Sequence, residues 1–586
     1  MKRTWGISTL LVVLFALTPM APGQGQAAPG AATVADALAS VTPDAWGVVC
    51  VRNMAGCERK ILEIANRLGL PAMSPLMMAK GMMGLLSGVD DNGDLVLVIA
   101  PAASMEAIGS SVALLIPTTG YSELTSMMQL TPVDGAEGVS RTTLQGNEVF
   151  IGLKGKHAVL APSLDMAKKI LASKSAADRL LTPYQLKRMG EDDISIWVNT
   201  GAVLSSPLVA PLLALPQLSG AMETLKAMKS LQVGVRVEPA GVRLGFHVDL
   251  KEDSKMAQAI AATRGTDKSL LTGLPKEPFV FAMGGLYSKE AAAIAADQFA
   301  LMLDNPQLAT APLDKEKLGR LKDLLRAMTG QLRSFTFGAS ALQAGENGMI
   351  GTAAILTIDG DAKAFLTSVG EMIGVVKGGL ITEEGANKAL ATLEYRSGAE
   401  TIGGISVDQL VVDLSKIEGL EAEQIEDVKK VIGKEGIVIR LAAADAKRVI
   451  VTFGGGPDRL KAVAETVKAD KAPLAEDKGV AATAKALPAE RCSEVYIALD
   501  TLVRLIAEIS KVVGDLLPMT MPELNAPIGL AQVTVGKSAS QTELFLPMAQ
   551  VVAAKDLIMT LQGAAAPPAM EPAPAVREPK EPAKQN

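Results

Sequence analysis

One pattern occurs twice in this chain, once in each half of its 586 residues, and it limits the possible folds more than any other feature. Residues 193–200 alternate between apolar and polar side chains and run into an apolar, helix-like stretch, and residues 494–501 do the same. The segments before and after these stretches recur in the same order. The recurrence predicts a duplicated domain, with one copy over 42–265 and another over 266–563. The alternative is a generic rhythm of helices and strands without a common origin.

The patterns within each predicted copy indicate an α+β fold. Strand pairs joined by short turns, such as 233–237 with 242–248 and 528–535 with 541–546, outnumber strand–helix–strand crossovers. Hairpins of this kind favour a mainly antiparallel sheet with helices packed on one face. The apolar stretch 204–231 predicts two further helices, divided at Pro216.

Both ends of the chain differ from the rest. Residues 1–27 resemble a secretory signal, because two basic residues precede an apolar run over 7–17 and the small residues Gly25 and Ala27 mark a cleavage site. An uncleaved anchor is the other interpretation, although the run is short for a bilayer span. Residues 28–41 are predicted to be a linker. Residues 564–586, which combine Pro, Ala, Glu and Lys without periodicity, predict a disordered tail.

The charge balance argues against nucleic acid as a partner. Removing Lys2 and Arg3 from the 57 basic residues leaves 55 against 63 acidic ones, a net charge of −8. Phosphate binding needs clustered basic charge instead. After the N-terminal segment no stretch is apolar for long enough to form a transmembrane segment, so we expect no membrane span in the processed chain. Together with the signal-like N-terminus, this gives an expected location in the periplasm or outside the cell.

The three cysteines, Cys50, Cys57 and Cys492, do not have the spacing of a zinc site. We expect three buried, apolar thiols. A disulfide between Cys50 and Cys57 is the alternative in an oxidising compartment.

The order of the predicted elements resembles a known family. A strand, a helix that begins at residues 121–124, a strand pair, and Ala161-Pro162-Ser163 before another helix follow one another. This order resembles the DUF3352 group of exported bacterial proteins, and the opening segment 42–51 resembles the start of exported proteins of the planctomycete type. The resemblance covers most of residues 40–563. It implies an exported location and a style of fold, but no function, because that group has no assigned activity.

Two short motifs could bind ions, and each has a simpler interpretation. Asp90-Asp91-Asn92-Gly93-Asp94 spaces its oxygens as a calcium loop does, but Leu95 and Pro101 stand where such a loop needs Gly and Glu. We therefore expect a plain turn. Gly454-Gly455-Gly456 could hold an anion at the start of a helix, but it lacks the Lys of a phosphate-binding loop and is followed by Pro457. A strand-to-helix turn is the expected structure.

The remaining candidate residues also have ordinary structural explanations. His157 and His247, the only histidines, lack evident partners for catalysis or metal binding. The acidic stretch Glu191-Asp192-Asp193 predicts a solvated turn. A methionine-rich stretch indicates a helix packed in an aromatic-poor core, or else a groove for lipid or peptide, and consists of Met73, Met77, Met78, Met82 and Met83.

These observations nominate no catalytic, cofactor-binding or metal-binding residue. They predict an exported, non-enzymatic scaffold that binds an unknown protein or a component of the cell envelope. A carrier that holds an apolar ligand between the sheet and its helices is the alternative. A hydrolase whose site is assembled from distant residues is a third possibility.

Overall fold

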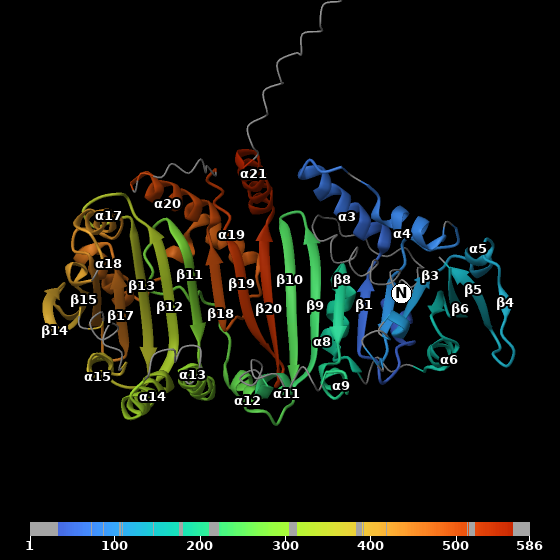
Figure 1. Ribbon diagram of the computed structural model, residues 1–586, viewed down its shortest axis with the longest axis horizontal. Coiled ribbons are helices and arrows are strands. Elements are labelled where there is room, and N and C mark those ends of the chain that lie inside the picture. The colour runs from blue at the N-terminus through green and yellow to red at the C-terminus, as the bar shows by residue number, and fades with distance from the viewer. Residues whose placement is uncertain are drawn as a thin grey trace, which may run out of the picture.

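The computed structural model describes residues 33–71, 73–85, 87–102, 104, 107, 109–144, 146–174, 180–209, 222–303, 313–381, 390, 392–417, 419–512, 514 and 522–565. The predicted signal over 1–27 therefore lies outside the described residues, as does the predicted tail from residue 566 onward. Within the described part, the strands form one antiparallel sheet of twenty strands, with helices along both of its long borders (Figure 1). This confirms the α+β class and the antiparallel pairing.

Ten strands come from the first part of the chain: β1 (Gly47–Val51), β2 (Leu95–Ile99), β3 (Val112–Pro117), β4 (Thr131–Pro132), β5 (Val139–Leu144), β6 (Asn147–Lys154), β7 (His157–Ala161), β8 (Ile194–Val198), β9 (Met228–Glu238) and β10 (Gly241–Leu250). From the centre of the sheet outward they lie in the order β10, β9, β8, β1, β2, β3, β7, β6, β5, β4.

Ten more strands follow: β11 (Phe279–Leu286), β12 (Leu332–Ala341), β13 (Ile350–Ile358), β14 (Leu393–Ile402), β15 (Ile405–Val412), β16 (Ile437–Ala443), β17 (Arg448–Phe453), β18 (Ser493–Ile497), β19 (Ile528–Val535) and β20 (Ala539–Pro547). From the centre outward their order is β20, β19, β18, β11, β12, β13, β17, β16, β15, β14. Strands β10 and β20 pair at the centre and join the two sets into one sheet (Figure 1).

The helices of the first part are α2 (Val34–Leu38), α3 (Met54–Arg67), α4 (Pro75–Met83), α5 (Tyr121–Thr125), α6 (Leu164–Ala172), α8 (Pro183–Glu191), α9 (Thr200–Leu204), α11 (Met222–Ala227) and α12 (Lys255–Ala262). Those of the second part are α13 (Lys289–Met302), α14 (Lys315–Gly330), α15 (Ala362–Lys377), α17 (Ala422–Ile432), α18 (Gly456–Lys468), α19 (Lys478–Ala486), α20 (Leu499–Val512) and α21 (Met548–Ala565). Short 3-10 turns lie at Gly109–Ser111, Leu414–Lys416 and Pro473–Glu476.

Helices cover both faces of the sheet, so the prediction of helices on one face is wrong. Adjacent residues of β17 point in opposite directions, as in any strand. Ile450 belongs to the apolar cluster that includes Val463 of α18. Val449 belongs to a cluster on the other face that includes Phe365 of α15. The reason is that inner strands carry apolar residues on both faces; β1, for example, is buried at all five positions.

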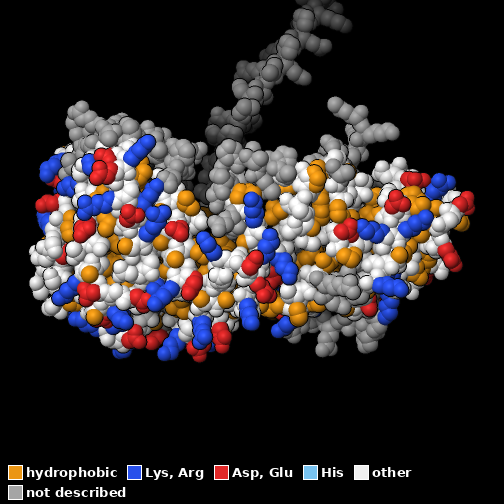
Figure 2. Space-filling view, turned by 90° about the horizontal axis from the view of Figure 1, so that it is seen from below, with side chains coloured by type: hydrophobic (Ala, Val, Ile, Leu, Met, Phe, Trp, Pro, Cys, Tyr) orange, Lys and Arg blue, Asp and Glu red, His pale blue; other side chains and the backbone are white. Residues whose placement is uncertain are grey.

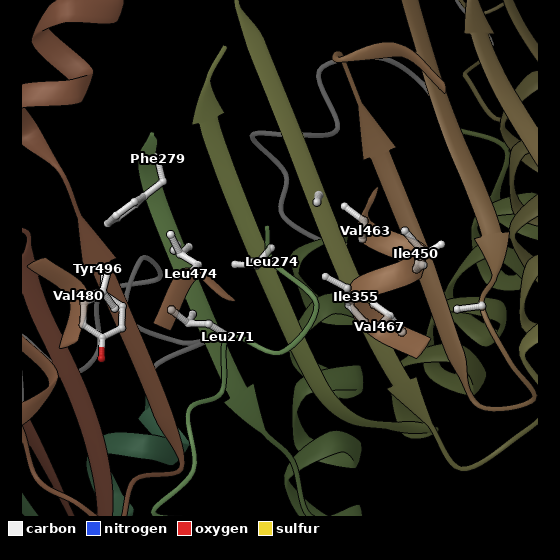
Figure 3. Close-up of a cluster of buried hydrophobic side chains, with 14 of the residues drawn as sticks. Leu271, Leu274, Phe279, Ile355, Ile450, Val463, Val467, Leu474, Val480 and Tyr496 are labelled. Atoms are coloured by element: carbon white, nitrogen blue, oxygen red, sulfur yellow. The ribbon is translucent and has the colours of Figure 1, made fainter. Parts of the chain in front are cut away.

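The largest apolar cluster of the second part shows how the helices lie on the sheet. Figure 3 shows Ile355 and Ile450 on neighbouring strands beside Val463 and Val467 of α18. Leu271 and Leu274, from the segment before β11, lie in the same cluster. This cluster and the cluster around Trp197 in the first part place an apolar core on each side of the central strands.

The predicted linker over 28–41 is wrong for its described residues. Thr33 and Asp36 form a capping box that starts α2, and Ala37, Leu38 and Val41 are buried in the first apolar cluster. Burial of these apolar side chains stabilises the folded chain, so the segment packs on the core and does not remain an exposed linker. Helix α21 ends at Ala565, so its last two residues lie within the predicted tail.

Candidate functional site

A group of buried polar side chains lies at the centre of the sheet, beneath α8, where β10 meets β20. We call this group the polar junction. Its members are Gln185, Arg188 and Asp192 of α8 and its C-terminal cap, Gln232 of β9, His247 and Asp249 of β10, and Gln541 and Glu543 of β20; each is less than a tenth exposed.

Local sequence explains how α8 reaches the junction. The helix begins at Pro183 behind a capping box formed by Thr182 and Gln185. The spacing from Gln185 to Arg188 places both on the face that contacts the sheet. Beneath them, Gly234 and Gly245 leave space on β9 and β10. A Cβ at Gly245 would lie 2.8 Å from both the Arg188 guanidinium and the Gln541 amide, and one at Gly234 would overlap the Asp192 carboxylate.

Ion pairs in the junction connect the two sets of strands. Arg188 Nη1 lies 2.9 Å from Glu543 Oε1 on β20, and its Nη2 lies 3.2 Å from Asp192 Oδ1. Arg236 of β9 approaches the same Asp192 oxygen at 3.3 Å. Burial raises the pKa of Asp192 to about 6, although the neighbouring positive charges of Arg188 and Arg236 act to lower this pKa. The loss of hydration at this carboxylate therefore outweighs its ion pairs.

His247 lies in the middle of the junction. Its cross-strand neighbours are Gln232 and Gln541, and its ring stacks on Tyr184 at a centroid distance of 4.8 Å. Among the described residues, neither ring nitrogen has a hydrogen-bond partner, nor does Oε1 of either glutamine. His247 Nε2 lies 3.6 Å from Asp249 Oδ2.

The His247–Asp249 pair does not form a catalytic constellation. Ser230 donates a hydrogen bond from Oγ to Asp249 Oδ2 at 3.2 Å, so its hydroxyl is directed to the acid and not to the imidazole. His247 is 2% exposed, and substrate would have to displace α8 to reach it. The arrangement fits a structural role, in which polar contacts hold α8 on the central strands.

The residues Asp90–Asp94 form the predicted turn, and their carboxylates bind groups of the protein itself. Asp90 Oδ1 accepts a hydrogen bond from the Asn92 N–H at 3.1 Å, as in an Asx turn. Asp91 pairs with Lys80 of α4 at 2.5 Å, and Asp94 accepts the Asn53 N–H at 2.7 Å. The described residues contain no group of three or more His, Cys, Asp or Glu side chains that could hold a metal ion.

The glycine stretch Gly454–Gly456 is the expected strand-to-helix turn. All three residues have positive φ, between 65° and 72°, which explains why glycine stands at each position. The Gly455 N–H donates to the Asn347 carbonyl at 3.1 Å, so the neighbouring loop, and not an anion, receives this donor.

The structure does not bring the two histidines together. His157 lies on β7 and His247 on β10, with β3, β2, β1, β8 and β9 between them. His157 Nε2 lies 3.2 Å from the Asp94 carbonyl, and burial lowers the pKa of this imidazole.

The acidic stretch and the methionines are placed differently from the prediction. Asp192 and Asp193 are 1% and 4% exposed, so they are buried and not solvated. Asp193 pairs with Lys60 at 2.6 Å and accepts the Val237 N–H, which satisfies its carboxylate without water.

The methionines on and before α4 are largely exposed, which corrects the prediction of a core helix. Their side chains are exposed by 66% at Met73, 60% at Met77, 39% at Met78 and 41% at Met82, while Met83 is half-buried.

The three cysteines are free and buried, as expected. Burial raises the pKa of Cys57 to about 12 and that of Cys50 well above its usual range. These thiols are poor nucleophiles at neutral pH.

Sequence reasoning missed most of the polar junction. Arg188, Gln232, Gln541 and Glu543 come from segments far apart in the chain. The pairings of β9 with β10 and of β10 with β20, together with the packing of α8 on these strands, bring them together. One signal was present in the sequence: Arg188 and Asp192 have opposite charges four residues apart, a spacing that places two side chains on the same face of a helix.

No protein-family model and no curated protein matches this chain. Three crystal forms of TP0453 align with parts of it, at 11%, 7% and 10% identity. They cover 36%, 49% and 36% of this chain and 79%, 98% and 78% of their own, with TM-scores of 0.23, 0.22 and 0.21. Structural matches with TM-scores this low do not establish a shared fold or function.

Proposed function

We propose that this protein is an exported, non-enzymatic scaffold with a binding or envelope-associated role. The observation that carries the proposal is that the buried charged side chains discussed above form ion pairs with one another. Arg188, Glu543 and Asp192 neutralise one another beneath α8, and Lys60 and Asp193 do the same beside α3. Groups paired in this way hold α8 and α3 on the sheet, and their burial leaves no open site in which a substrate could reach them.

The duplication of the chain is part of the same proposal. Read outward from the central pair, β10 to β4 and β20 to β14 follow the same order, with every label of the second set larger by ten. This agreement over ten strands supports a copied module, because independent folds rarely share so long an order of pairing. A copied scaffold gains surface area without acquiring a new active site.

Export and membership of the DUF3352-like group stay proposals drawn from the N-terminal segment and the order of elements. In the described part of the chain, every helix is too short or too polar to cross a bilayer. On the face seen in Figure 2, acidic and basic side chains are interspersed, which does not favour a nucleic-acid partner there.

A carrier role receives less support from the described residues. Between sheet and helices, side chains such as Ile355 and Val463 fill the space that a ligand would need. A groove of about 500 Å³ lies instead between α14 and α15, and charged side chains that include Lys317, Arg320 and Glu371 line it. A lining of this kind does not suit an apolar ligand.

Native mass spectrometry of the protein recovered from the cell envelope and the medium tests the proposal. We expect a chain that begins at Ala28 and carries no stoichiometric lipid. A chain that retains residues 1–27 in the cytoplasm would overturn export. A bound apolar molecule at one copy per chain would replace the scaffold by the carrier.

A further inference from the structure

Helix α4 reverses the arrangement of charged and apolar residues that is usual for a helix at a protein surface. Its single charged residue, Lys80, is 8% exposed, and its Nζ lies 2.5 Å from Asp91 Oδ1. The side chains of Met77, Met78 and Met82 are instead exposed by 60%, 39% and 41%. Surface helices of globular proteins normally turn their charges to solvent and their apolar side chains to the core. The outer face of α4 therefore suits apolar surroundings better than water.

This outer face is uncharged as well as apolar. Leu70 and Met73, in the connection before α4, are 51% and 66% exposed and extend it. No acidic residue occurs within 64–89, although the chain contains 63 of them. The basic residues of this stretch, Arg67 and Lys80, are both held in ion pairs. We call the exposed apolar group the α4 surface; its members are Leu70, Met73, Met77, Met78 and Met82.

The fold itself does not require an apolar outer face at this place. Helix α14 follows β11 and α13 as α4 follows β1 and α3 (Figure 1). Its exposed positions are mostly charged and include Lys315, Glu316 and Asp323. The α4 surface is therefore a property of its own sequence, and it is larger than the scattered exposed apolar residues that need no explanation.

The kind of partner follows from the shape and composition of this border. Helices α21 and α20 lie on the same border as α3 and α4 (Figure 1), and they expose Ile506, Ile558 and Met559 by 37%, 54% and 62%. The groove between α14 and α15 lies on the opposite border. None of the four helices α3, α4, α20 and α21 contains an aromatic residue, whereas protein interfaces are usually anchored by Trp, Tyr and Arg. An elongated, uncharged row of Leu, Ile and Met side chains fits the hydrocarbon of a lipid layer better than a protein partner.

We propose that the α4 surface docks on a phospholipid bilayer, with its leucine and methionine side chains at the boundary between headgroups and acyl chains. Helix α4 has nine residues and is therefore about 14 Å long, against a hydrocarbon thickness of about 30 Å, so the contact is peripheral. The inference rests on the proposed envelope-associated role and names the membrane as the component that is bound. It differs from the carrier, which would enclose a lipid between the sheet and its helices.

Flotation with phosphatidylcholine vesicles tests this docking on the processed chain, which lacks the apolar residues 7–17. We expect the protein to float with the vesicles at about 0.1 M and at about 1 M NaCl, because salt does not screen an uncharged contact. A variant with Met73→Glu and Met77→Glu should lose about 100-fold in partition, or about 10-fold for each apolar side chain withdrawn from the membrane. Its urea midpoint should stay that of the parent, since both side chains are exposed and residue 77 is the third after the cap Ser74, a position that favours glutamate.

A matched control places the same two charges on α13 at the opposite border, with Phe299→Glu and Met302→Glu at positions that are 54% and 62% exposed. It should float as the parent does. The inference is overturned if the parent does not float, or if both variants lose binding alike. It is also overturned if the parent is oligomeric without vesicles and the α4 variant is monomeric, because a second copy would then cover the surface. Each of these results leaves the exported scaffold standing, since native mass spectrometry of the N-terminus decides that proposal separately.

Discussion

Replacing Asp192 by asparagine should remove a defined dependence of stability on pH. The Asp192 carboxyl is 1% exposed, and burial raises its pKa from 3.8 to about 6. A raised pKa means that the folded protein holds this proton more tightly than the unfolded chain does. The contribution of protonated Asp192 to stability is therefore fully present below pH 3.8 and is lost as the pH rises through about 6.

The size of the effect follows from the difference between the two pKa values. Each pKa unit corresponds to about 1.4 kcal/mol, so a difference of about two units gives about 3 kcal/mol. Between about pH 4 and 6, stability of the parent relative to Asp192→Asn should fall by about 1.4 kcal/mol per pH unit. Above that range, the difference between parent and variant should level off.

Urea unfolding of both proteins from pH 4 to 8 measures this difference, and titrations that are common to both cancel. Asp44→Asn is a suitable control, because the contact with Lys169 lowers the pKa of Asp44 even though partial burial acts to raise it. The contribution of Asp44 is lost only at pH values below its usual pKa, so its variant should differ from the parent by a constant amount over the same range. If the Asp192→Asn difference were constant or rose with pH, pairing with Arg188 and Arg236 would outweigh burial and the argument would fail.

Three further outcomes are expected. Gly234→Ala should destabilise the protein by about 1–3 kcal/mol in urea unfolding, because the added Cβ overlaps the Asp192 carboxylate; an unchanged midpoint would show that α8 shifts freely. Trp197→Ala should cost about 3–5 kcal/mol, because this 1% exposed ring fills the first apolar cluster, whereas Phe246→Ala, at 40% exposure, should cost less. A thiol reagent at pH 7 should leave Cys57 unmodified until urea unfolds the chain, because burial raises the pKa of that thiol to about 12; rapid native labelling would contradict this.

Local patterns in the sequence predicted several elements well. The strand over 194–198 is β8, and the hairpin predicted at 233–237 and 242–248 is β9 with β10. Both depend on alternation and a turn within a short stretch of chain. The prediction failed at 228–231, which is strand and not helix, because Met228 pairs with Leu250 across the hairpin. Here a partner in the neighbouring strand overrides the local preference.

The sequence by itself determined the α+β class, several hairpins and the absence of a recognisable catalytic motif, because these depend on residue type and short-range spacing. Only the tertiary structure decided that the two sets of strands join at β10 and β20, that Asp192 and His247 are buried there, and that the α4 methionines face outward. Burial and pairing depend on which distant segment covers a residue, and no local pattern carries that information.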